Sequence, residues 1–170
     1  MNSKVLGALL VIAACGGCGF MIAFRYVTRI RMMDDLLDSL EFMISDLQYR
    51  ATPLPQLCRQ AGNRCNGKVG EILTDLAEEL DAQISPNAAL CMTSVLERSG
   101  CADLIIYTAM TDLGKQLGLF DLPGQIRGLE QCREHCATSI EKMNQDKSSR
   151  LRSYQTLGLC AGAAIAILFV

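Results

Sequence analysis

The chain begins and ends in long stretches that carry no charged side chain. Residues 5–24 are rich in Ala, Val, Ile, Leu and Gly, and residues 153–170 form a second uncharged stretch. About twenty apolar residues are what an α-helix needs to cross a hydrocarbon core of ~30 Å. We therefore expect an N-terminal transmembrane helix in residues 1–25, a helical domain in residues 26–152 and a C-terminal transmembrane helix in residues 153–170.

Basic residues near the two stretches predict which side of the membrane holds the middle domain. Lys and Arg are in excess on the cytoplasmic side of membrane helices. Only Lys4 precedes the first stretch, and no basic residue follows the second. The ends that face the middle domain are basic, with Arg25, Arg29, Arg31, Lys147, Arg150 and Arg152. We expect a protein of the cell membrane whose middle domain lies in the cytoplasm and whose termini lie across the membrane.

A competing interpretation comes from the sequence Ile-Ala-Ala-Cys at residues 12–15, which has the form of a bacterial lipoprotein cleavage site. Lipidation of Cys15 would make the chain an extracytoplasmic lipoprotein. The apolar stretch continues past Cys15 to Phe24 and ends in arginines. A signal peptide is shorter, and a polar mature sequence usually follows its cleavage site. The sequence favours the membrane helix, with the lipoprotein as the alternative.

Composition narrows the class of partner. The net charge is −2 and Trp is absent, which argues against a nucleic-acid surface. The nine cysteines could form disulfides in an oxidising compartment. The helical segments are long enough to bury a core without such links, and we expect thiols in a reducing cytoplasm.

The middle domain shows the spacing of amphipathic helices and no alternating pattern typical of a strand. The first helix continues out of the membrane stretch with an apolar seam, which Leu36 and Met43 widen beyond a strict coiled coil. Its polar face is expected to hold Asp34, Asp35, Asp38, Glu41 and Asp46. The seam consists of Ile30, Met33, Leu37, Leu40, Ile44, Leu47 and Ala51. This pattern predicts an all-α bundle.

Pairs of a capping residue and proline predict where two further helices begin. Thr52-Pro53 and Ser85-Pro86 each offer an N-cap followed by proline at the first helical position. Glycine predicts interruptions at Gly62-Asn63 and at Asn66-Gly67. An apolar period restarts with Val69, Ile72, Leu73, Leu76 and Leu80.

Two more apolar stripes follow. Gly100 is expected to close the helix that begins near residue 86, and Gly118 the next one. Asp121 is expected to cap the last long helix, which should run into the C-terminal membrane stretch. The stripe before Gly118 comprises Leu104, Ile105, Ala109, Met110, Leu113 and Leu117, and the last helix has Ile126, Leu129, Cys132 or Cys136, Ile140 and Met143 inward.

Small residues recur at intervals of four in both membrane stretches. They are Ala13 and Gly17 in the first stretch and Gly158 and Gly162 in the second. Small residues at this spacing let membrane helices approach closely. Gly and Ala are also common in such helices in general, so either interpretation accounts for them.

The residues that could carry chemistry are few. Cys132, His135 and Cys136 fall within about one helical turn and are weak candidates for a metal or redox site. No second ligand pair accompanies them, so two apolar cysteines beside a surface histidine is the alternative. No phosphate-binding loop or nucleophile elbow occurs, and carboxylate pairs such as Glu78-Glu79 fall on polar faces. We expect no enzyme, no cofactor and no small-molecule substrate.

Three blocks in this order resemble a known family. The first has Leu37-Asp38-Ser39-Leu40-Glu41 and ends in Thr52-Pro53-Leu54. The second is Leu113-Gly114-Lys115-Gln116-Leu117-Gly118, followed by Asp121 and Gln125, with Leu113 where the family has an aromatic residue. The third is Tyr154 with Leu157-Gly158 before the terminal apolar stretch. Together they resemble the stage III sporulation protein AB family of spore-forming bacteria over nearly the whole chain.

The resemblance implies a structural function. Such proteins belong to a membrane complex, made in the mother cell, that forms a channel between mother cell and forespore. This member resembles the inner-membrane platform protein of type II secretion machines. A cytoplasmic helical domain of this kind is expected to contact other proteins of the complex, including a secretion-type ATPase. The resemblance transfers no catalytic residue.

Two surfaces are predicted to bind partners. The first is the turn that contains Gly114, Lys115, Leu117, Gly118, Asp121 and Gln125. The second is the acidic face of the first helix, around Asp38 and Glu41. Helix capping alone could also account for the turn, with Gly118 as a stop and Asp121 as a cap.

Overall fold

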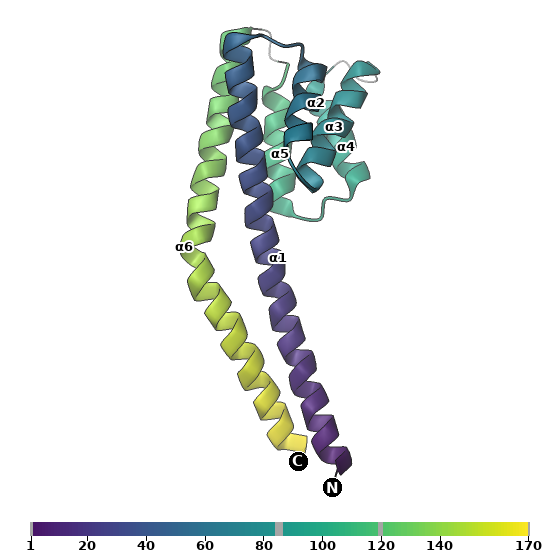
Figure 1. Ribbon diagram of the computed structural model, residues 1–170, viewed down its shortest axis with the longest axis vertical. Helices are drawn as coiled ribbons and strands as arrows, with labels where there is room; N and C mark the ends of the chain where they lie inside the picture. Colours follow the sequence, from purple (N-terminus) through teal and green to yellow (C-terminus); the bar gives the residue numbers. More distant parts are fainter. Residues whose placement is uncertain (1, 84–86, 119–120, 170) are drawn as a thin grey trace. The chain divides into compact units, whose positions relative to one another are not determined.

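The computed structural model describes residues 2–83, 87–118 and 121–169, with side chains for residues 21, 24–83, 87–118 and 121–145. These residues form helices and no strand, which confirms the all-α prediction for this part of the chain (Figure 1). The helices are α1 (Asn2–Tyr49), α2 (Leu54–Arg64), α3 (Lys68–Asp81), α4 (Ala88–Ser99), α5 (Leu104–Gln116) and α6 (Leu122–Phe169).

The chain divides into two compact units. Residues 1–30 and 141–170 form one unit, which contains the first part of α1 and the last part of α6. Within it the Tyr26 hydroxyl donates a hydrogen bond of 2.7 Å to the carbonyl oxygen of Met143. Over the described residues, no helical stretch combines the length and hydrophobicity that a membrane span requires. The side chains of Ala13, Gly17, Gly158, Gly162 and Cys15 lie outside the described residues.

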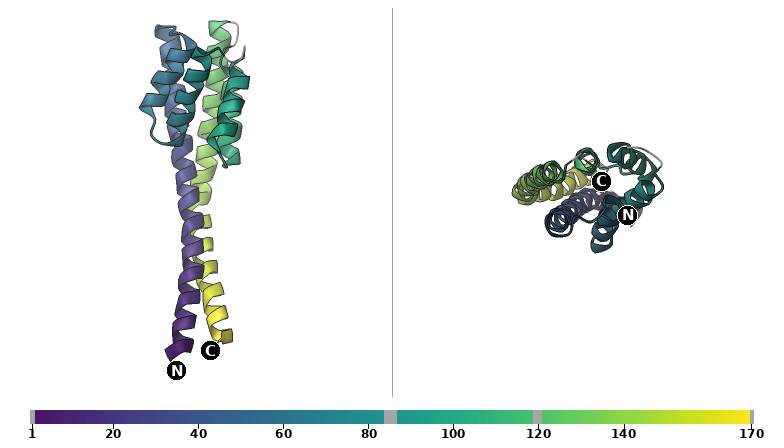
Figure 2. Two further views of the ribbon diagram at one scale, coloured as in Figure 1. Left: turned by 90° about the vertical axis from the view of Figure 1, so that its right-hand side faces the viewer. Right: turned by 90° about the horizontal axis from the view of Figure 1, so that it is seen from above.

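Residues 31–140 form the second unit, a helical bundle with its own core. Helices α2 to α5 lie alongside the part of α1 that belongs to this unit (Figure 2). Most of the wide apolar seam of α1 is confirmed, because Met33, Leu36, Leu40, Met43 and Leu47 are buried, whereas Leu37 is half-buried. At ~25 cal/mol per Å² of apolar surface, such burial supplies most of the favourable free energy of folding. Ala51 lies beyond the end of α1, where its φ is +50°.

Helices α2 and α3 form a close antiparallel pair that two glycines permit (Figure 1). A Cβ added at Gly70 would lie 2.6 Å from the carbonyl oxygen of Cys65 and 2.7 Å from that of Gly62. Side chains larger than hydrogen are therefore excluded at this crossing. Arg59 of α2 and Asp81 of α3 form an ion pair of 2.5 Å at the exposed edge of the pair.

Two predicted helix boundaries around α2 are wrong. The helix begins at Leu54, with Pro53 in the N-cap position and no side-chain capping bond, so Thr52 is not the cap. Helix α2 also continues through Gly62-Asn63, because the missing side chain at Gly62 is used for contact with α3. The interruption at Asn66-Gly67 is confirmed, and Gly67 has a φ of +75° immediately before α3.

The remaining helix ends follow ordinary capping rules. Ser85-Pro86 lies outside the described residues, and α4 begins at Ala88 after Asn87, whose side chain accepts a bond of 2.9 Å from the Ala89 amide. Gly100 ends α4 in the left-handed conformation, as predicted. Asp103 caps α5 by accepting from the amides of Ile105 and Ile106.

The predicted stripe of α5 is partly wrong. Leu104 is 76% exposed and Ile105 is 38% exposed, whereas Ile106 is fully buried. The later part of the stripe is confirmed, because Met110, Leu113 and Leu117 are buried, and only at its start does Ile106 face the core in place of Leu104 and Ile105. In α6, Leu129, Cys136, Ile140 and Met143 are buried as predicted.

Two acidic residues that the sequence places on polar faces are buried. Glu79 is 5% exposed. It forms an ion pair of 3.0 Å with Arg98 and accepts a hydrogen bond of 3.1 Å from the Ser94 hydroxyl. These bonds join α3 to α4. Asp46 is also 5% exposed, and its Oδ2 atom has no hydrogen-bond partner among the described residues.

Candidate partner-binding surfaces

The turn between α5 and α6 has a structural function at three of its six predicted positions. Gly114 is buried against α4, where an added Cβ would lie 2.6 Å from the Cβ of Met92. Leu117 and Gln125 are also buried. A substitution at Gly114 therefore changes packing between α4 and α5 before it changes any contact with a partner.

The other three positions of the turn are accessible. Lys115 is exposed and forms an ion pair of 2.9 Å with Asp112 one turn earlier in α5. Gly118 is exposed and has a φ of +79°, which favours glycine. Asp121 is exposed and accepts a hydrogen bond of 3.2 Å from the Gly124 amide, so it caps α6 as predicted. Lys115, Gly118 and Asp121 are the part of this turn that a partner could contact.

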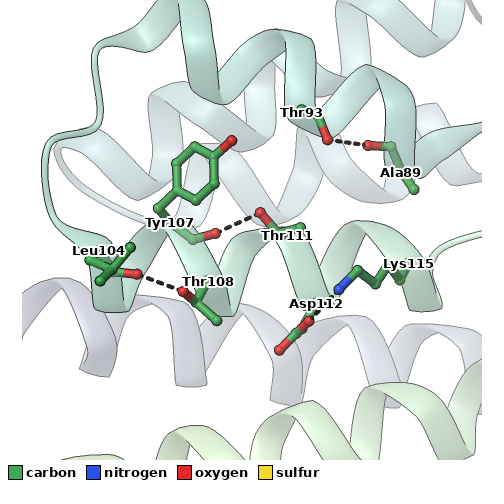
Figure 3. Close-up of polar contacts among 8 residues, drawn as sticks. All are labelled: Ala89, Thr93, Leu104, Tyr107, Thr108, Thr111, Asp112 and Lys115. Atoms are coloured by element: carbon green, nitrogen blue, oxygen red, sulfur yellow. Dashed lines mark hydrogen bonds and ion pairs between the residues drawn. The ribbon is translucent and has the colours of Figure 1, made fainter.

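An apolar groove lies between α5 and α6, beside Met33 of α1. We call it the α5–α6 groove; its volume is about 290 Å³. Figure 3 shows Leu104, Thr108 and Asp112 on one side of α5, with Tyr107 on the opposite side. The Thr108 hydroxyl donates to the Leu104 carbonyl oxygen at 2.8 Å, so it needs no other partner. The apolar walls come mainly from Leu104, Ile105, Ala109, Cys132 and Cys136.

The three candidate metal ligands line this groove, where the pKa values of the two thiols are raised. Burial raises the pKa of Cys136 to about 11, with further contributions from Cys132 and Asp112. Burial, with Asp112, also raises the pKa of Cys132. A metal ligand or redox-active cysteine needs the thiolate form. His135 is exposed, and among the described residues no group of three or more Cys, His, Asp and Glu side chains is placed to hold a metal ion.

A second groove runs along the polar face of α1 and contains both acidic residues predicted to bind a partner. It has a volume of about 700 Å³, and we call it the acidic groove. Asp38 and Glu41 are exposed on its walls. Burial, with the negative charges of Asp38 and Asp34, raises the pKa of Asp35. The charged residues that line it are Asp35, Asp38, Glu41, Asp46, Arg50 and Arg64.

Sequence reasoning missed the residues that give this groove its shape. Phe42 lies under the guanidinium of Arg64, whose carbon is 4.5 Å from the ring centroid. The Ser39 hydroxyl and the Cys65 thiol are 2.7 Å apart, which holds the loop after α2 against α1. The sequence does indicate that Asp35, Asp38 and Asp46 share one face of a helix, because of their spacing. It does not indicate that another segment covers the end of that face.

The comparisons with known proteins now decide the family. The model of the family described as stage III sporulation protein AB matches residues 4–170. The chain belongs to the stage III sporulation protein AB family. Stage III sporulation protein AB of Bacillus subtilis (strain 168) is 22% identical over 170 residues, which cover 98% of this chain and 99% of that relative.

A solved structure of stage III sporulation protein AB (SpoIIIAB) is similar in fold. The TM-score is 0.64 at 18% identity, and the match covers 72% of this chain and 98% of that chain. At this identity the likeness shows the fold alone. Membership of the stage III sporulation protein AB family gives the protein a function in sporulation, in contact with other proteins of a sporulation complex.

Proposed function

We propose that this protein is a non-enzymatic platform in the membrane of the mother cell. Residues 1–25 and 153–170 hold it in the bilayer as transmembrane helices, and the bundle faces the cytoplasm. There it supports the assembly of the channel complex between mother cell and forespore, in the manner of the platform protein of a type II secretion machine. The observation that carries this proposal is the family match over residues 4–170, which includes both uncharged stretches.

The chemistry of the bundle supports an adaptor better than an enzyme. The cysteines of the α5–α6 groove have raised pKa values, and Lys115 and Glu79 are each held in an ion pair. Such groups stabilise helices and present charge, and they offer no activated nucleophile. A lipoprotein anchored at Cys15 stays the alternative, and the topology experiment below distinguishes it.

The proposed partner in the cytoplasm is the secretion-type ATPase of the complex. We assign its contact to the exposed part of the turn, at Lys115, Gly118 and Asp121. The experiment measures binding of the purified ATPase to the detergent-solubilised full chain by biolayer interferometry. Lys115→Glu should weaken binding at least ~5-fold, since charge reversal at an interface places like charges together.

A matched control comes from α3. Lys68 forms an i,i+3 ion pair with Glu71, as Lys115 does with Asp112. Lys68→Glu changes the net charge by the same amount as Lys115→Glu, but in α3 and not in the turn between α5 and α6. Equal loss of binding in both variants would show general electrostatic attraction and contradict the assignment to the turn. Undiminished binding in Lys115→Glu would also contradict it.

Topology is tested in intact cells with a membrane-impermeant thiol reagent, followed by denaturation and mass spectrometry. The described cysteines of the bundle are Cys58, Cys65, Cys91, Cys101, Cys132 and Cys136. Labelling of the half-buried thiols of Cys101 and Cys132 only after permeabilisation is the expected result for a cytoplasmic bundle. Labelling in intact cells would place the bundle outside, and it would favour the lipoprotein and remove a cytoplasmic ATPase as partner.

A further inference from the structure

Asp46 is the most buried residue that lines the acidic groove. Its side chain is 5% exposed, while Asp38 and Glu41 on the walls are exposed. Its Oδ2 atom is fully covered and receives no hydrogen bond from the part of the chain that the structure describes. A buried carboxylate oxygen normally has a donor, because water no longer solvates it.

The position of Asp46 on α1 adds a second unfavourable feature. The backbone carbonyl oxygen of Asp46 accepts hydrogen bonds from the amides of Arg50 at 2.7 Å and Ala51 at 3.1 Å. Asp46 therefore lies in the last turn of α1. The C-terminal end of a helix carries partial negative charge and disfavours a carboxylate. Neither packing nor the helix therefore accounts for an acid at this position.

The arginines that line the groove leave it acidic. Four carboxylates line it against two guanidinium groups. The guanidinium of Arg64 lies over the ring of Phe42, which engages one of its faces. Tyr49 lines the same groove and is largely exposed, so an aromatic ring also borders its opening. The carboxylates are Asp35, Asp38, Glu41 and Asp46.

This combination matches one kind of occupant. A guanidinium is planar, carries several donors in a fixed fork and stacks on aromatic rings. A divalent ion is a poorer fit, since no group of three or more suitable ligands is placed around an ion site in the described residues. We propose that the acidic groove receives an arginine side chain from a basic segment of a partner protein, with a guanidinium N–H donating to Asp46 Oδ2.

This inference goes beyond docking of an ATPase at the turn, because it concerns another face of the bundle and states the chemistry of what binds there. The partner segment supplies positive charge near the four carboxylates of the groove. It also supplies a hydrogen-bond donor for Asp46 Oδ2. Because Oδ2 is fully covered, the Asp46 side chain has to rotate towards the groove before a guanidinium N–H can donate to it, whereas the helices keep their positions.

The test uses the full chain in dodecyl maltoside and a fluorescein-labelled peptide, Gly-Arg-Gly-Arg-Gly, at low salt. Binding is followed by fluorescence anisotropy. The matched peptide has citrulline, which is uncharged and nearly the same shape, at both arginine positions. We expect the arginine peptide to bind at least ~10-fold more tightly than the citrulline peptide, since hydrogen bonds between charged groups are the stronger ones.

Two variants separate the groove from general acidity. Asp46→Asn removes the buried charge and should weaken binding of the arginine peptide about 10-fold. Asp34→Asn removes the same charge from an exposed position of α1 that does not line the groove, and should change binding less than about 2-fold. A second groove variant, Asp38→Asn, should weaken binding by an intermediate factor and guards against a folding defect at Asp46.

Asp46→Asn should keep or raise the melting temperature, because it removes an unpartnered buried charge near a helix C-terminus. Unaltered peptide binding by a folded Asp46→Asn would overturn the proposal. Equal binding of the arginine and citrulline peptides would do the same, as would equal losses in Asp34→Asn and Asp46→Asn. Lys115→Glu should leave peptide binding unchanged, so this proposal and the docking proposal fail separately.

Discussion

At the scale of single residues, the bundle holds its carboxylates in three different ways. Glu79 is buried, and its Oε1 atom is paired with Arg98 and Ser94. Asp35 is partly buried beside two like charges. Asp46 is buried without a donor at Oδ2 among the described residues. The first arrangement stabilises the bundle, whereas Asp35 opposes folding at neutral pH and Asp46 keeps a buried oxygen that a donor from a partner would satisfy.

Asp35 gives the first prediction, which concerns pH. Its folded-state pKa is raised above the ordinary value of 3.8 by burial and by Asp38 and Asp34. The ionised form is therefore disfavoured in the folded state, and this destabilisation is present above the folded pKa and disappears as the pH falls through it towards the unfolded value. Asp35→Asn should be more stable than the wild type at pH 7 by urea unfolding.

The difference between Asp35→Asn and the wild type should shrink as the pH falls through the raised folded-state pKa of Asp35 towards its ordinary value of 3.8. Asp75→Asn, on α3, serves as the control because Asp75 lies outside this cluster. A wild type that is more stable than Asp35→Asn at pH 7 would contradict the prediction.

The thiols give the second prediction. Burial raises the pKa of Cys58 to about 12, and burial with two neighbouring groups raises that of Cys136 to about 11. At pH 8 a thiol with a pKa of about 11 is ionised in roughly 0.1% of molecules, and only the thiolate is alkylated. Iodoacetamide should leave both unmodified in the folded chain and label both in 6 M guanidinium, read by peptide mass spectrometry. Rapid labelling of folded Cys58 would show that α2 is not packed as described.

At the scale of elements, glycine has opposite functions in different helices. Gly100 and Gly118 end helices through a left-handed backbone, which a sequence pattern can predict. Gly62 and Gly70 lie inside helices α2 and α3 and allow two backbones to approach. The sequence alone predicts a helix break at Gly62, because a glycine that faces another helix and a glycine that ends a helix look the same in a sequence.

The third prediction follows from the close approach of α2 and α3. Gly70→Ala would place a Cβ against two backbone carbonyl oxygens, which cannot move without shifting a helix. The substitution should lower the free energy of unfolding by about 1–3 kcal/mol, the usual effect of overpacking. Chemical denaturation of the full chain measures it.

Glu78→Ala is the matched control, since Glu78 is an exposed residue of the same helix. Its effect should stay within about 0.5 kcal/mol. A Gly70→Ala variant as stable as the wild type would show that the added Cβ meets no such obstruction. The crossing of α2 and α3 described above would then be wrong.

At the scale of the whole molecule, periodicity predicted most of the fold. Most positions of the α1 seam and of the inward face of α6 are confirmed because helix spacing fixes which residues share a face, although Leu37 and Ile126 are only half-buried. Only the start of the α5 stripe was predicted wrongly, since Leu104, Ile105 and Ile106 are consecutive apolar residues and tertiary packing selects Ile106 for the core.

The candidate sites were less accessible to sequence reasoning. Asp38 and Glu41 were identified because acidic side chains repeat on one helical face. Arg64 and Cys65, which help to line the same groove, come from the end of α2 and the loop after it, and only the folded chain brings them to α1. The function itself came from the resemblance of three short blocks and from the family match, because the bundle carries no motif whose chemistry names a partner.

The fourth prediction concerns the bundle as an independent unit. Residues 31–140 contain their own core, from Met33 to Ile140. The solved SpoIIIAB structure matches 72% of this chain with 98% of its own length, so a shorter chain has this fold. A fragment of residues 31–140 should be helical and unfold in one cooperative transition by circular dichroism. A broad, non-cooperative melt would show that the remainder of α1 and α6 is required.

The order of the short helices has a consequence for synthesis on the ribosome. Helices α2 and α3, α3 and α4, and α4 and α5 pack as successive neighbours. Contacts that are local in sequence form quickly and need little loop closure. The hairpin of α2 and α3 can therefore assemble while later parts of the chain are still being translated, and α4 and α5 can join it in turn. Helix α6, which brings Leu129 and Cys136 to the core, is made after these helices and completes the core of the bundle.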